Sequence, residues 1–143
     1  MDCYDVLKLD RQYCFPLYAC SRELIKEYKP FLDELDLTYT QYLTMLVLWD
    51  KKSINVKALG NQLFLDSGTL TPLLKKLEAK GLVSRKRSSE DERNLIVSIT
   101  ESGEELKERA VTIPAQVAKC SNLTEDEKET IYRLLYKFLN RNK

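Results

Sequence analysis

Apolar residues between positions 65 and 100 are spaced first as on a helix and then as on strands. The residues at the i, i+3, i+4 and i+7 positions of one helix face are Leu70, Leu73, Leu74 and Leu77. Asp66 and Ser67 precede this face as N-cap residues, and Lys80 is followed by Gly81, the residue type that most readily ends a helix in a left-handed conformation. We therefore predict a helix that starts beside Asp66 and ends at Gly81.

Residues 82–87 and 95–100 both have the composition of β-strands. In the second strand, the residues that share one face are Leu95, Val97 and Ile99. The polar connection SSEDER is too long for a tight turn, so we expect a hairpin with a projecting tip. A capped helix followed directly by such a hairpin is typical of a winged helix-turn-helix, which lays the helix in the major groove of DNA.

The outer face of the predicted helix carries short polar side chains first and cations later. The candidate DNA-contacting residues on this face are Ser67, Thr69, Thr71, Pro72 and Lys75. A Ser or Thr hydroxyl can hydrogen-bond several bases, and a proline ring can contact a thymine methyl group. In the hairpin, Asp91 precedes Arg93 by two residues and could hold its guanidinium extended for a narrow minor groove. A charged loop alone is more often a solvated hairpin with a surface ion pair, but the preceding helix favours the DNA interpretation.

Further helices are predicted around this winged module. The first runs from about Tyr13 or Pro16 to Asp33, and the second from Thr38 to Asp50. The third runs from Val56 to Leu63 and has Asn55 as its N-cap. After the hairpin, a long helix starts at Thr100 and is interrupted at Pro114, and a last helix starts at a capping box formed by Thr124 and Glu127. In the second of these helices, we expect one face to hold Tyr39, Tyr42, Leu43 and Leu46. The last helix has an apolar stripe made of Ile131, Leu134, Leu135, Phe138 and Leu139. Such a stripe is often ordinary core, but pairing with a second subunit is the economical use of it in a small domain.

The predicted fold class is mainly α with a small β-hairpin wing (α+β). We expect a single domain, 1–143, in which a winged helix-turn-helix at about 38–100 is flanked by dimerisation helices at about 10–35 and 101–141. A two-fold dimer would read two half-sites about 34 Å apart, or a multiple of that, on one face of the DNA.

Charge is distributed unevenly along the chain. The 143 residues carry a formal net charge of only +1, which by itself gives no indication of nucleic acid. Residues 67–87, however, hold six cations against one Glu, a local charge of +5 that leaves −4 for the rest. The six cations are Lys75, Lys76, Lys80, Arg85, Lys86 and Arg87. Positive charge is thus concentrated where DNA phosphates would lie.

Composition also excludes several classes of protein. The N-terminus lacks the basic start and apolar run of a signal peptide, and the longest uncharged run, residues 37–49, is too short to span a bilayer. We expect a cytoplasmic protein with reduced cysteines and no membrane partner. The sequence has no histidine and no CxxC motif among its four cysteines, which argues against histidine bases and most zinc sites. We therefore expect no enzymatic activity, no metal and no cofactor.

Two segments, LDSGTLTPLLKKLE and DERNLIVSITESG, resemble the recognition helix and wing of the MarR family, within its organic-hydroperoxide-sensing, OhrR-type branch. The resemblance extends over nearly the whole chain. It implies that Cys14, in the motif CFPLY, is the redox sensor. It implies that Tyr28 in KEYKP and Tyr39 in LTYTQY lie against the sensor sulfur of the partner subunit. It also implies that the predicted helix reads the major groove while Arg93, held by Asp91, enters the minor groove.

Sulfur chemistry supports this role. A thiolate that attacks the distal oxygen of a hydroperoxide becomes a sulfenic acid, phenol hydroxyls favour the charged sulfur, and aromatic rings suit an alkyl peroxide. Pro16 departs from expectation, because a proline inside a continuing helix removes a hydrogen bond; the helix then starts later than in relatives or is strained. Cys120 lies where two-cysteine members of the branch keep a resolving thiol, and a small cellular thiol is the alternative cap. Cys3 and Cys20 have no assigned role, and a lone cysteine is commonly a small hydrophobe.

The sequence thus predicts a dimeric repressor that binds a pseudo-palindromic operator in duplex DNA and is released when organic hydroperoxide oxidises Cys14. Two alternatives stay open. A repressor of the same fold would be released by a small aromatic ligand, with Cys14 a spectator. A cysteine peroxidase is disfavoured by the lack of histidine and of a cation paired with Cys14, and it leaves the basic helix and wing unexplained.

Overall fold

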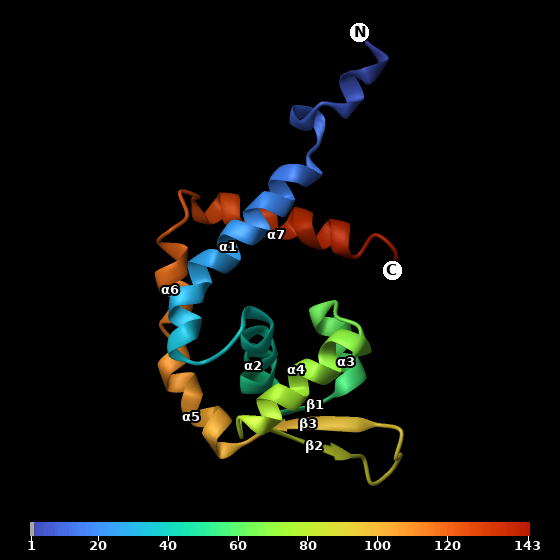
Figure 1. Ribbon diagram of the computed structural model, residues 1–143, viewed down its shortest axis with the longest axis vertical. Coiled ribbons are helices and arrows are strands. Elements are labelled where there is room, and N and C mark those ends of the chain that lie inside the picture. The colour runs from blue at the N-terminus through green and yellow to red at the C-terminus, as the bar shows by residue number, and fades with distance from the viewer. Residues whose placement is uncertain (1) are drawn as a thin grey trace. The chain divides into compact units, whose positions relative to one another are not determined.

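A computed structural model describes residues 2–143, and the chain divides into two compact units between Ile113 and Pro114. The elements of the first unit are η1 (Cys3–Leu7), η2 (Leu9–Arg11), α1 (Cys14–Glu34), α2 (Tyr39–Lys51), β1 (Ser53–Asn55), α3 (Val56–Leu63), α4 (Ser67–Ala79), β2 (Val83–Arg87), β3 (Leu95–Ile99) and α5 (Glu101–Ala110) (Figure 1). The helix α6 (Ile113–Ala118) begins at the division, and α7 (Glu125–Leu139) belongs to the second unit. These elements confirm the predicted mainly α fold with a β-hairpin wing.

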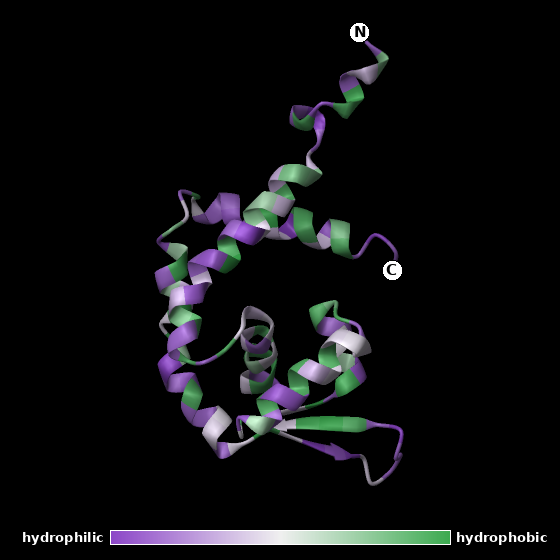
Figure 2. Cartoon of the chain, viewed as in Figure 1, coloured by the Kyte–Doolittle hydropathy of each residue, from purple (hydrophilic) through white to green (hydrophobic). Residues whose placement is uncertain are grey.

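The three strands form one antiparallel sheet in the order β1-β3-β2. The central strand β3 is hydrophobic apart from Ser98, whereas the tip of the hairpin is hydrophilic (Figure 2). The sequence did not indicate β1, because three residues are too few to show an alternating pattern. The pairing of β1 is a tertiary contact, in which the hydroxyl oxygens of Ser53 and Ser98 lie 2.8 Å apart.

The core of the winged module is built around α2, which packs against α1, α3, α4, α5 and the sheet. Its buried residues are Gln41, Tyr42, Thr44, Met45, Val47, Leu48 and Trp49. Fully buried side chains of neighbouring elements include Leu59, Leu74, Leu77 and Val97. The predicted apolar face of α2 is therefore wrong at Leu46, which is 41% exposed. A helix surrounded by neighbours buries most of its circumference, so its exposed side is the one without a neighbour.

The two ends of α4 lie where the sequence predicted, and local features fix each of them. The Asp66 carboxylate accepts a hydrogen bond from the backbone N–H of Thr69 at 2.8 Å, and this bond lowers the pKa of Asp66. Lys80 is the C-cap residue, and Gly81 follows with a φ of +75°. The predicted caps Asn55 and Thr124 also accept the expected backbone hydrogen bonds, and Thr38 and Thr100 do the same at the starts of α2 and α5.

Pro16 is the third residue of α1, which begins at Cys14. The first four N–H groups of an α-helix have no partner within the helix, so a proline among them removes no hydrogen bond. The expectation of a lost bond at Pro16 is therefore wrong. The helix begins two residues before Pro16, so this proline lies in the first turn, where the backbone N–H that proline lacks would have no partner within the helix. The proline that lies inside the helix is Pro30.

Two cations bind the C-terminal end of α1. The guanidinium of Arg109 in α5 donates to the Glu34 carbonyl at 2.6 Å, and the Lys80 ammonium at the end of α4 donates to the Asp36 carbonyl. Cations stabilise the carbonyl end of a helix. These contacts connect the end of α1 to α5, and the turn after α1 to the C-cap residue of α4.

Beyond the wing, the chain remains helical but is interrupted as predicted. The helix α5 ends at Ala110, and Pro114 is the second residue of α6. The last helix, α7, starts with the predicted capping box of Thr124 and Glu127, and none of its residues is buried. Within residues 2–143, no helix is both long enough and apolar enough to cross a bilayer.

The start of α5 is packed closely against the base of the wing. The Trp49 indole N–H donates to the Gly103 carbonyl at 2.8 Å in a buried hydrogen bond. A Cβ atom at Gly103 would lie 2.7 Å from the side chain of Ile99 and would also overlap the Leu82 carbonyl oxygen. Only glycine fits at this junction.

Replacing Gly103 by alanine should lower the free energy of unfolding by roughly 1–3 kcal/mol, because two backbone segments must separate. Urea unfolding followed by circular dichroism measures the change. The control is Gly68→Ala in α4, where a new Cβ meets only Asp66 Oδ1 at 3.4 Å. That variant should change stability by less than about 1 kcal/mol, and in the stabilising direction. Equal losses in the two variants would contradict the close approach at Gly103.

Candidate functional site

The outer face of α4 is the first candidate surface. Its exposed residues are the predicted ones: Ser67, Thr69, Thr71, Pro72 and Lys75. The opposite face of the helix is buried through Leu70, Leu73, Leu74 and Leu77. Because these buried leucines fix the rotation of α4 (labelled in Figure 1), the short polar side chains of its first turns face solvent.

The wing presents an extended cation beside its tip. Arg93 is 92% exposed along its side chain, and the Asp91 carboxylate accepts hydrogen bonds from its backbone N–H at 3.0 Å and from its Nε at 3.4 Å. The side-chain amide of Asn55 also donates to Asn94 at 3.2 Å, which attaches the base of the wing to the start of α3. The predicted contact of Asp91 with Arg93 is therefore present, with the guanidinium extended into solvent.

A pocket lies between α3, the start of α4 and the base of the wing. Its polar lining residues are Asn55, Lys57, Asn61, Asp66, Ser67, Arg93 and Asn94, and the Asp66 carboxylate is occupied by the N-cap hydrogen bond. The structure thus brings Ser67 of the predicted recognition helix and Arg93 of the wing to one concave surface. Amide, hydroxyl and cationic groups at a helix N-terminus are suited to phosphate oxygens.

Two of the six cations counted between residues 67 and 87 are used inside the protein. Arg85 is only 17% exposed, and the Glu78 carboxylate accepts from its guanidinium at 3.1 Å and from its backbone N–H at 2.9 Å. The hydrogen bond from the Arg85 side chain is the main reason that the pKa of Glu78 is lowered. Lys80 faces the Asp36 carbonyl and Gln41. The expectation that all six cations face phosphates is therefore wrong for this pair.

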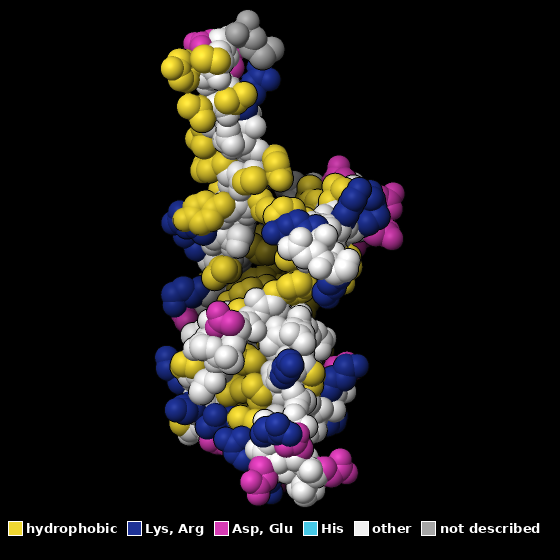
Figure 3. All heavy atoms as spheres, turned by 90° about the vertical axis from the view of Figure 1, so that its right-hand side faces the viewer, with side chains coloured by type: hydrophobic (Ala, Val, Ile, Leu, Met, Phe, Trp, Pro, Cys, Tyr) yellow, Lys and Arg dark blue, Asp and Glu magenta, His cyan; other side chains and the backbone are white. Residues whose placement is uncertain are grey.

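The other four cations, Lys75, Lys76, Lys86 and Arg87, are exposed. Lys and Arg side chains gather over the winged module (Figure 3). The positive surface is thus smaller than the sequence count suggested, but it lies beside the outer face of α4 and the wing.

A cluster of tyrosines forms a second candidate site, where α1 meets α2. The rings of Tyr28 and Tyr39 have centroids 5.0 Å apart, and Tyr42 lies 5.7 Å from the first and 6.3 Å from the second. Burial raises the pKa of Tyr28 and of Tyr39, and it raises the pKa of Tyr42 to about 12 with help from its two neighbours. At neutral pH, all three phenols therefore keep their protons and can donate hydrogen bonds.

Cys14 is not part of this cluster within one chain. It is exposed at the first position of α1, fourteen residues before Tyr28 on the same helix. At 1.5 Å per residue, the two positions are about 21 Å apart along the helix axis, well beyond the length of a tyrosine side chain. The structure thus brings Tyr28 and Tyr39 together and leaves Cys14 apart from them.

The other cysteines are also exposed. Cys120 follows the last residue of α6 by two positions, and its thiol donates weakly to the Gln116 carbonyl at a sulfur–oxygen distance of 3.9 Å. Cys3 belongs to η1 and Cys20 to α1. Among residues 2–143, no group of three or more Cys, Asp or Glu side chains is arranged to hold a metal ion.

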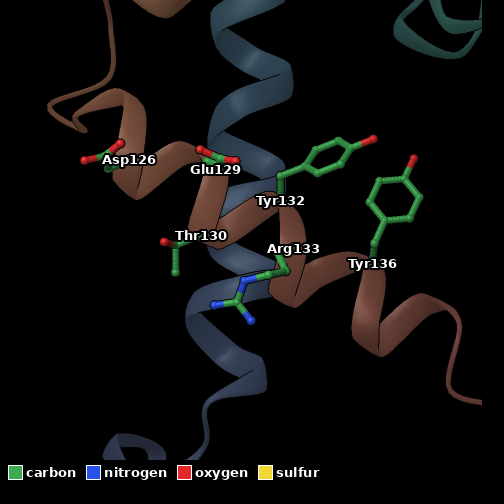
Figure 4. A pocket seen from close by; sticks show the side chains of 6 residues that line it. All are labelled: Asp126, Glu129, Thr130, Tyr132, Arg133 and Tyr136. Atoms are coloured by element: carbon green, nitrogen blue, oxygen red, sulfur yellow. The ribbon is translucent and has the colours of Figure 1, made fainter.

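A separate pocket lies on α7 and is lined by Asp126, Glu129, Thr130, Tyr132, Arg133 and Tyr136 (Figure 4). The Tyr132 and Tyr136 rings are 4.7 Å apart, and a hydrogen bond with Tyr132 raises the pKa of Tyr136. The lining is polar apart from these rings and contains no cysteine, so it does not suit the predicted peroxide chemistry. The adjacent apolar stripe of α7 is exposed.

The sequence did not predict the contacts of Tyr42 and Trp49. It predicts Tyr42 only as part of an apolar helix face and gives no role to Trp49. The signal available was their spacing, because Tyr42 follows Tyr39 by nearly one helical turn and Trp49 follows Tyr42 by two.

Comparison with known proteins identifies the family. A family model described as transcriptional regulator SarA/Rot matches residues 26–110. The organic hydroperoxide resistance transcriptional regulator of Bacillus subtilis is 50% identical over 136 residues, which cover 95% of this chain and 92% of that protein. The chain belongs to the OhrR-type branch of the MarR family. SarZ of Staphylococcus haemolyticus is 46% identical over 94% of this MarR-family chain and 91% of its own length.

Solved structures of similar proteins support this assignment to the family. Reduced AbfR bound to DNA has a TM-score of 0.78 at 34% identity, with 94% of each chain covered. A disulfide-formed AbfR has a TM-score of 0.69 at 32% identity, covering 94% of this chain and 92% of that one. These relatives are transcriptional regulators rather than enzymes, and this MarR-family chain is a DNA-binding regulator.

Replacing Arg93 by alanine should weaken operator binding by roughly 10-fold, because one cation is lost from the wing. Fluorescence anisotropy with an operator duplex selected by the protein measures the affinity. Arg11→Ala, at an exposed arginine outside the winged module, is the control and should bind as the parent does. The rate of Cys14 oxidation should be the same in Arg93→Ala and in the parent. Unchanged affinity in Arg93→Ala would remove the wing from the interface.

The tyrosine cluster also predicts a pH dependence of stability. Burial holds the pKa of Tyr42 at about 12 in the folded protein against 10.0 for an ordinary tyrosine. A raised folded-state pKa contributes stability that is complete below about pH 10 and is lost as pH rises towards about 12. The free energy of unfolding, measured by urea titration across this window, should therefore fall more steeply in the parent than in Tyr42→Phe. Parallel slopes in the two proteins would contradict the burial of this hydroxyl.

Proposed function

We propose that the protein is a redox-sensing transcriptional repressor that binds a pseudo-palindromic operator as a homodimer and is released when an organic hydroperoxide oxidises Cys14. The observation that carries the proposal is the pair of half-buried phenols, Tyr28 and Tyr39, held 5.0 Å apart and distant from Cys14 of the same chain. In a two-fold dimer, this pair meets the Cys14 sulfur of the partner subunit. The names of two relatives support the redox role, since one is an organic hydroperoxide resistance regulator and AbfR is known in reduced, DNA-bound and disulfide forms.

The surface of α1 supports a dimer. The first half of this helix and the residue before it expose large apolar side chains, namely Tyr13, Phe15, Leu17, Tyr18, Leu24 and Ile25. Hydrophobic side chains run along this part of the molecule (Figure 3). Apolar surface of this extent is typical of a subunit interface. A second copy of the chain covers it. The exposed apolar stripe of α7 is also available for pairing with a second subunit.

The proposed chemistry takes place at the Cys14 sulfur. Phenol hydroxyls of the tyrosine pair hydrogen-bond the thiolate, which then attacks the distal oxygen of the hydroperoxide. A sulfur–oxygen bond forms as the peroxide O–O bond breaks, so sulfur is oxidised to sulfenic acid. The peroxide is reduced to an alkoxide, which takes up a proton and leaves as the alcohol.

A second thiol then caps the sulfenic acid and releases water. Cys120 is one candidate, since it is exposed and follows α6. A small cellular thiol is the other candidate. Either product replaces a hydrogen-bonded thiolate by a neutral, bulkier group, so the contacts of Tyr28 and Tyr39 with the sulfur are broken.

DNA release follows from geometry in this proposal. Ser67, Thr69, Thr71 and Pro72 read the major groove while Lys75 binds the backbone and Arg93 enters the minor groove. The two recognition helices of a dimer must match half-sites about 34 Å apart, or a multiple of that. A shift of α1 passes through Arg109 and Lys80 to the winged module and moves the helices out of register.

Replacing Cys14 by serine should leave operator binding of the untreated protein within about twofold of the parent, because the smaller serine hydroxyl can also accept hydrogen bonds from the phenols. One equivalent of cumene hydroperoxide should then release the parent and not Cys14→Ser in a gel-shift assay. Cys20→Ser is the matched control, since this cysteine is exposed on the same helix. It should be released like the parent.

Release of Cys14→Ser by the peroxide would refute the sensor role. Release by a small aromatic acid instead would support a ligand-controlled repressor. Intact mass measured after one equivalent of peroxide, with and without a small thiol, distinguishes the sulfenic acid, the mixed disulfide and a subunit crosslink through Cys120. Comparison with Cys120→Ser identifies the crosslink.

A further inference from the structure

Tyr42 is the buried member of the tyrosine cluster. It is only 2% exposed, whereas Tyr28 and Tyr39 are partly open to solvent. Its ring centroid lies 5.7 Å from that of Tyr28 on α1 and 6.3 Å from that of Tyr39 on its own helix. The two outer rings thus rest on one buried ring, which fixes their positions.

The same ring contacts the next aromatic residue of α2. Trp49 lies two turns further along the helix, and its ring meets Tyr42 edge-on at a centroid distance of 6.4 Å and an angle of 68°. Edge-to-face contacts of this kind have a preferred geometry, because the positive ring edge faces the negative ring face. Since both residues are buried, a displacement of one must be taken up by the other.

Trp49 ends this series at a junction of three elements. Its indole N–H donates to the Gly103 carbonyl of α5 at 2.8 Å. Gly103 in turn lies against Leu82 before β2 and Ile99 at the end of β3, too closely for any Cβ atom. The indole is therefore attached to the point from which both the wing and α5 extend.

We infer that Tyr42 is a positioning residue for Tyr28 and Tyr39, and that through Trp49 it couples this pair to Gly103 at the junction of the wing and α5. The inference rests on the proposed function, in which the pair contacts the sensor sulfur of the partner subunit. When the oxidised sulfur displaces the two outer rings, Tyr42 and Trp49 shift with them. The wing then changes its position relative to α5.

The experiment compares operator affinity in full-length proteins whose Cys14 is fully oxidised, as checked by intact mass. The variants are Tyr42→Leu, which removes the ring, and Trp49→Phe, which keeps an aromatic ring but removes the donor to Gly103. Both should bind operator in the reduced state. After oxidation they should retain on the order of 10-fold more affinity than the oxidised parent, because the coupling is broken. Tyr42→Phe keeps the ring and should be released like the parent.

Trp49 is the only tryptophan in the sequence, so tryptophan fluorescence reports on its contacts with Tyr42 and Gly103. Oxidation of Cys14 should change its emission spectrum in the parent and in Tyr42→Phe, and should leave it unchanged in Tyr42→Leu. If Tyr42→Leu does not fold, Trp49→Phe still tests the coupling through operator release.

Complete release of oxidised Tyr42→Leu or Trp49→Phe would overturn the inference, as would an unchanged Trp49 spectrum in the fully oxidised parent. The proposed function fails in a different way, through a parent protein that keeps its operator after Cys14 is oxidised. The two failures are thus separated by the behaviour of the parent alone.

Discussion

Burial of α2 on nearly all sides is the constraint on which the rest of the first unit depends. Met45 and Leu48 have no exposed surface, and each fully buried side chain of this size contributes roughly 1.5–3 kcal/mol. The helix α1, which carries Cys14, and the helices α4 and α5 all pack on α2. None of them can change its angle to another without changing a contact with α2. A regulator that must convert chemistry at one helix into movement of another needs such a shared, close-packed element.

Features set by neighbouring residues were predictable from the sequence. Asp66 and Thr124 each bind a backbone N–H three residues ahead, and Gly81 occupies a conformation that other residues avoid. Such preferences depend on a few adjacent positions, so the limits of α3, α4 and the hairpin could be read directly. The exposed face of α4 followed from the same periodicity, because its buried leucines define the opposite side.

Features set by distant contacts were not predictable. The strand β1 exists because Ile54 pairs with Val97, and no local pattern marks a strand of three residues. Leu46 is exposed because of where the neighbours of α2 lie, which a single helical period cannot indicate. The sequence predicts Arg85 and Lys80 as surface charge, whereas Arg85 binds Glu78 and Lys80 binds the Asp36 carbonyl. At the candidate redox site, the tyrosine pair could be named from a motif, but its dependence on Tyr42 required the positions of three rings from two helices.

The carboxylate of Glu78 binds both the backbone and the guanidinium of Arg85, so the end of the recognition helix and the first strand of the wing form one rigid body. In the proposed complex with DNA, the helix that enters the major groove and the wing beside it therefore keep a fixed offset. Operators for such a protein can vary in sequence within each contacted segment but not in the spacing between segments. One inserted base pair would rotate the duplex by about 35°, and either the helix or the wing would then face the wrong side of the backbone.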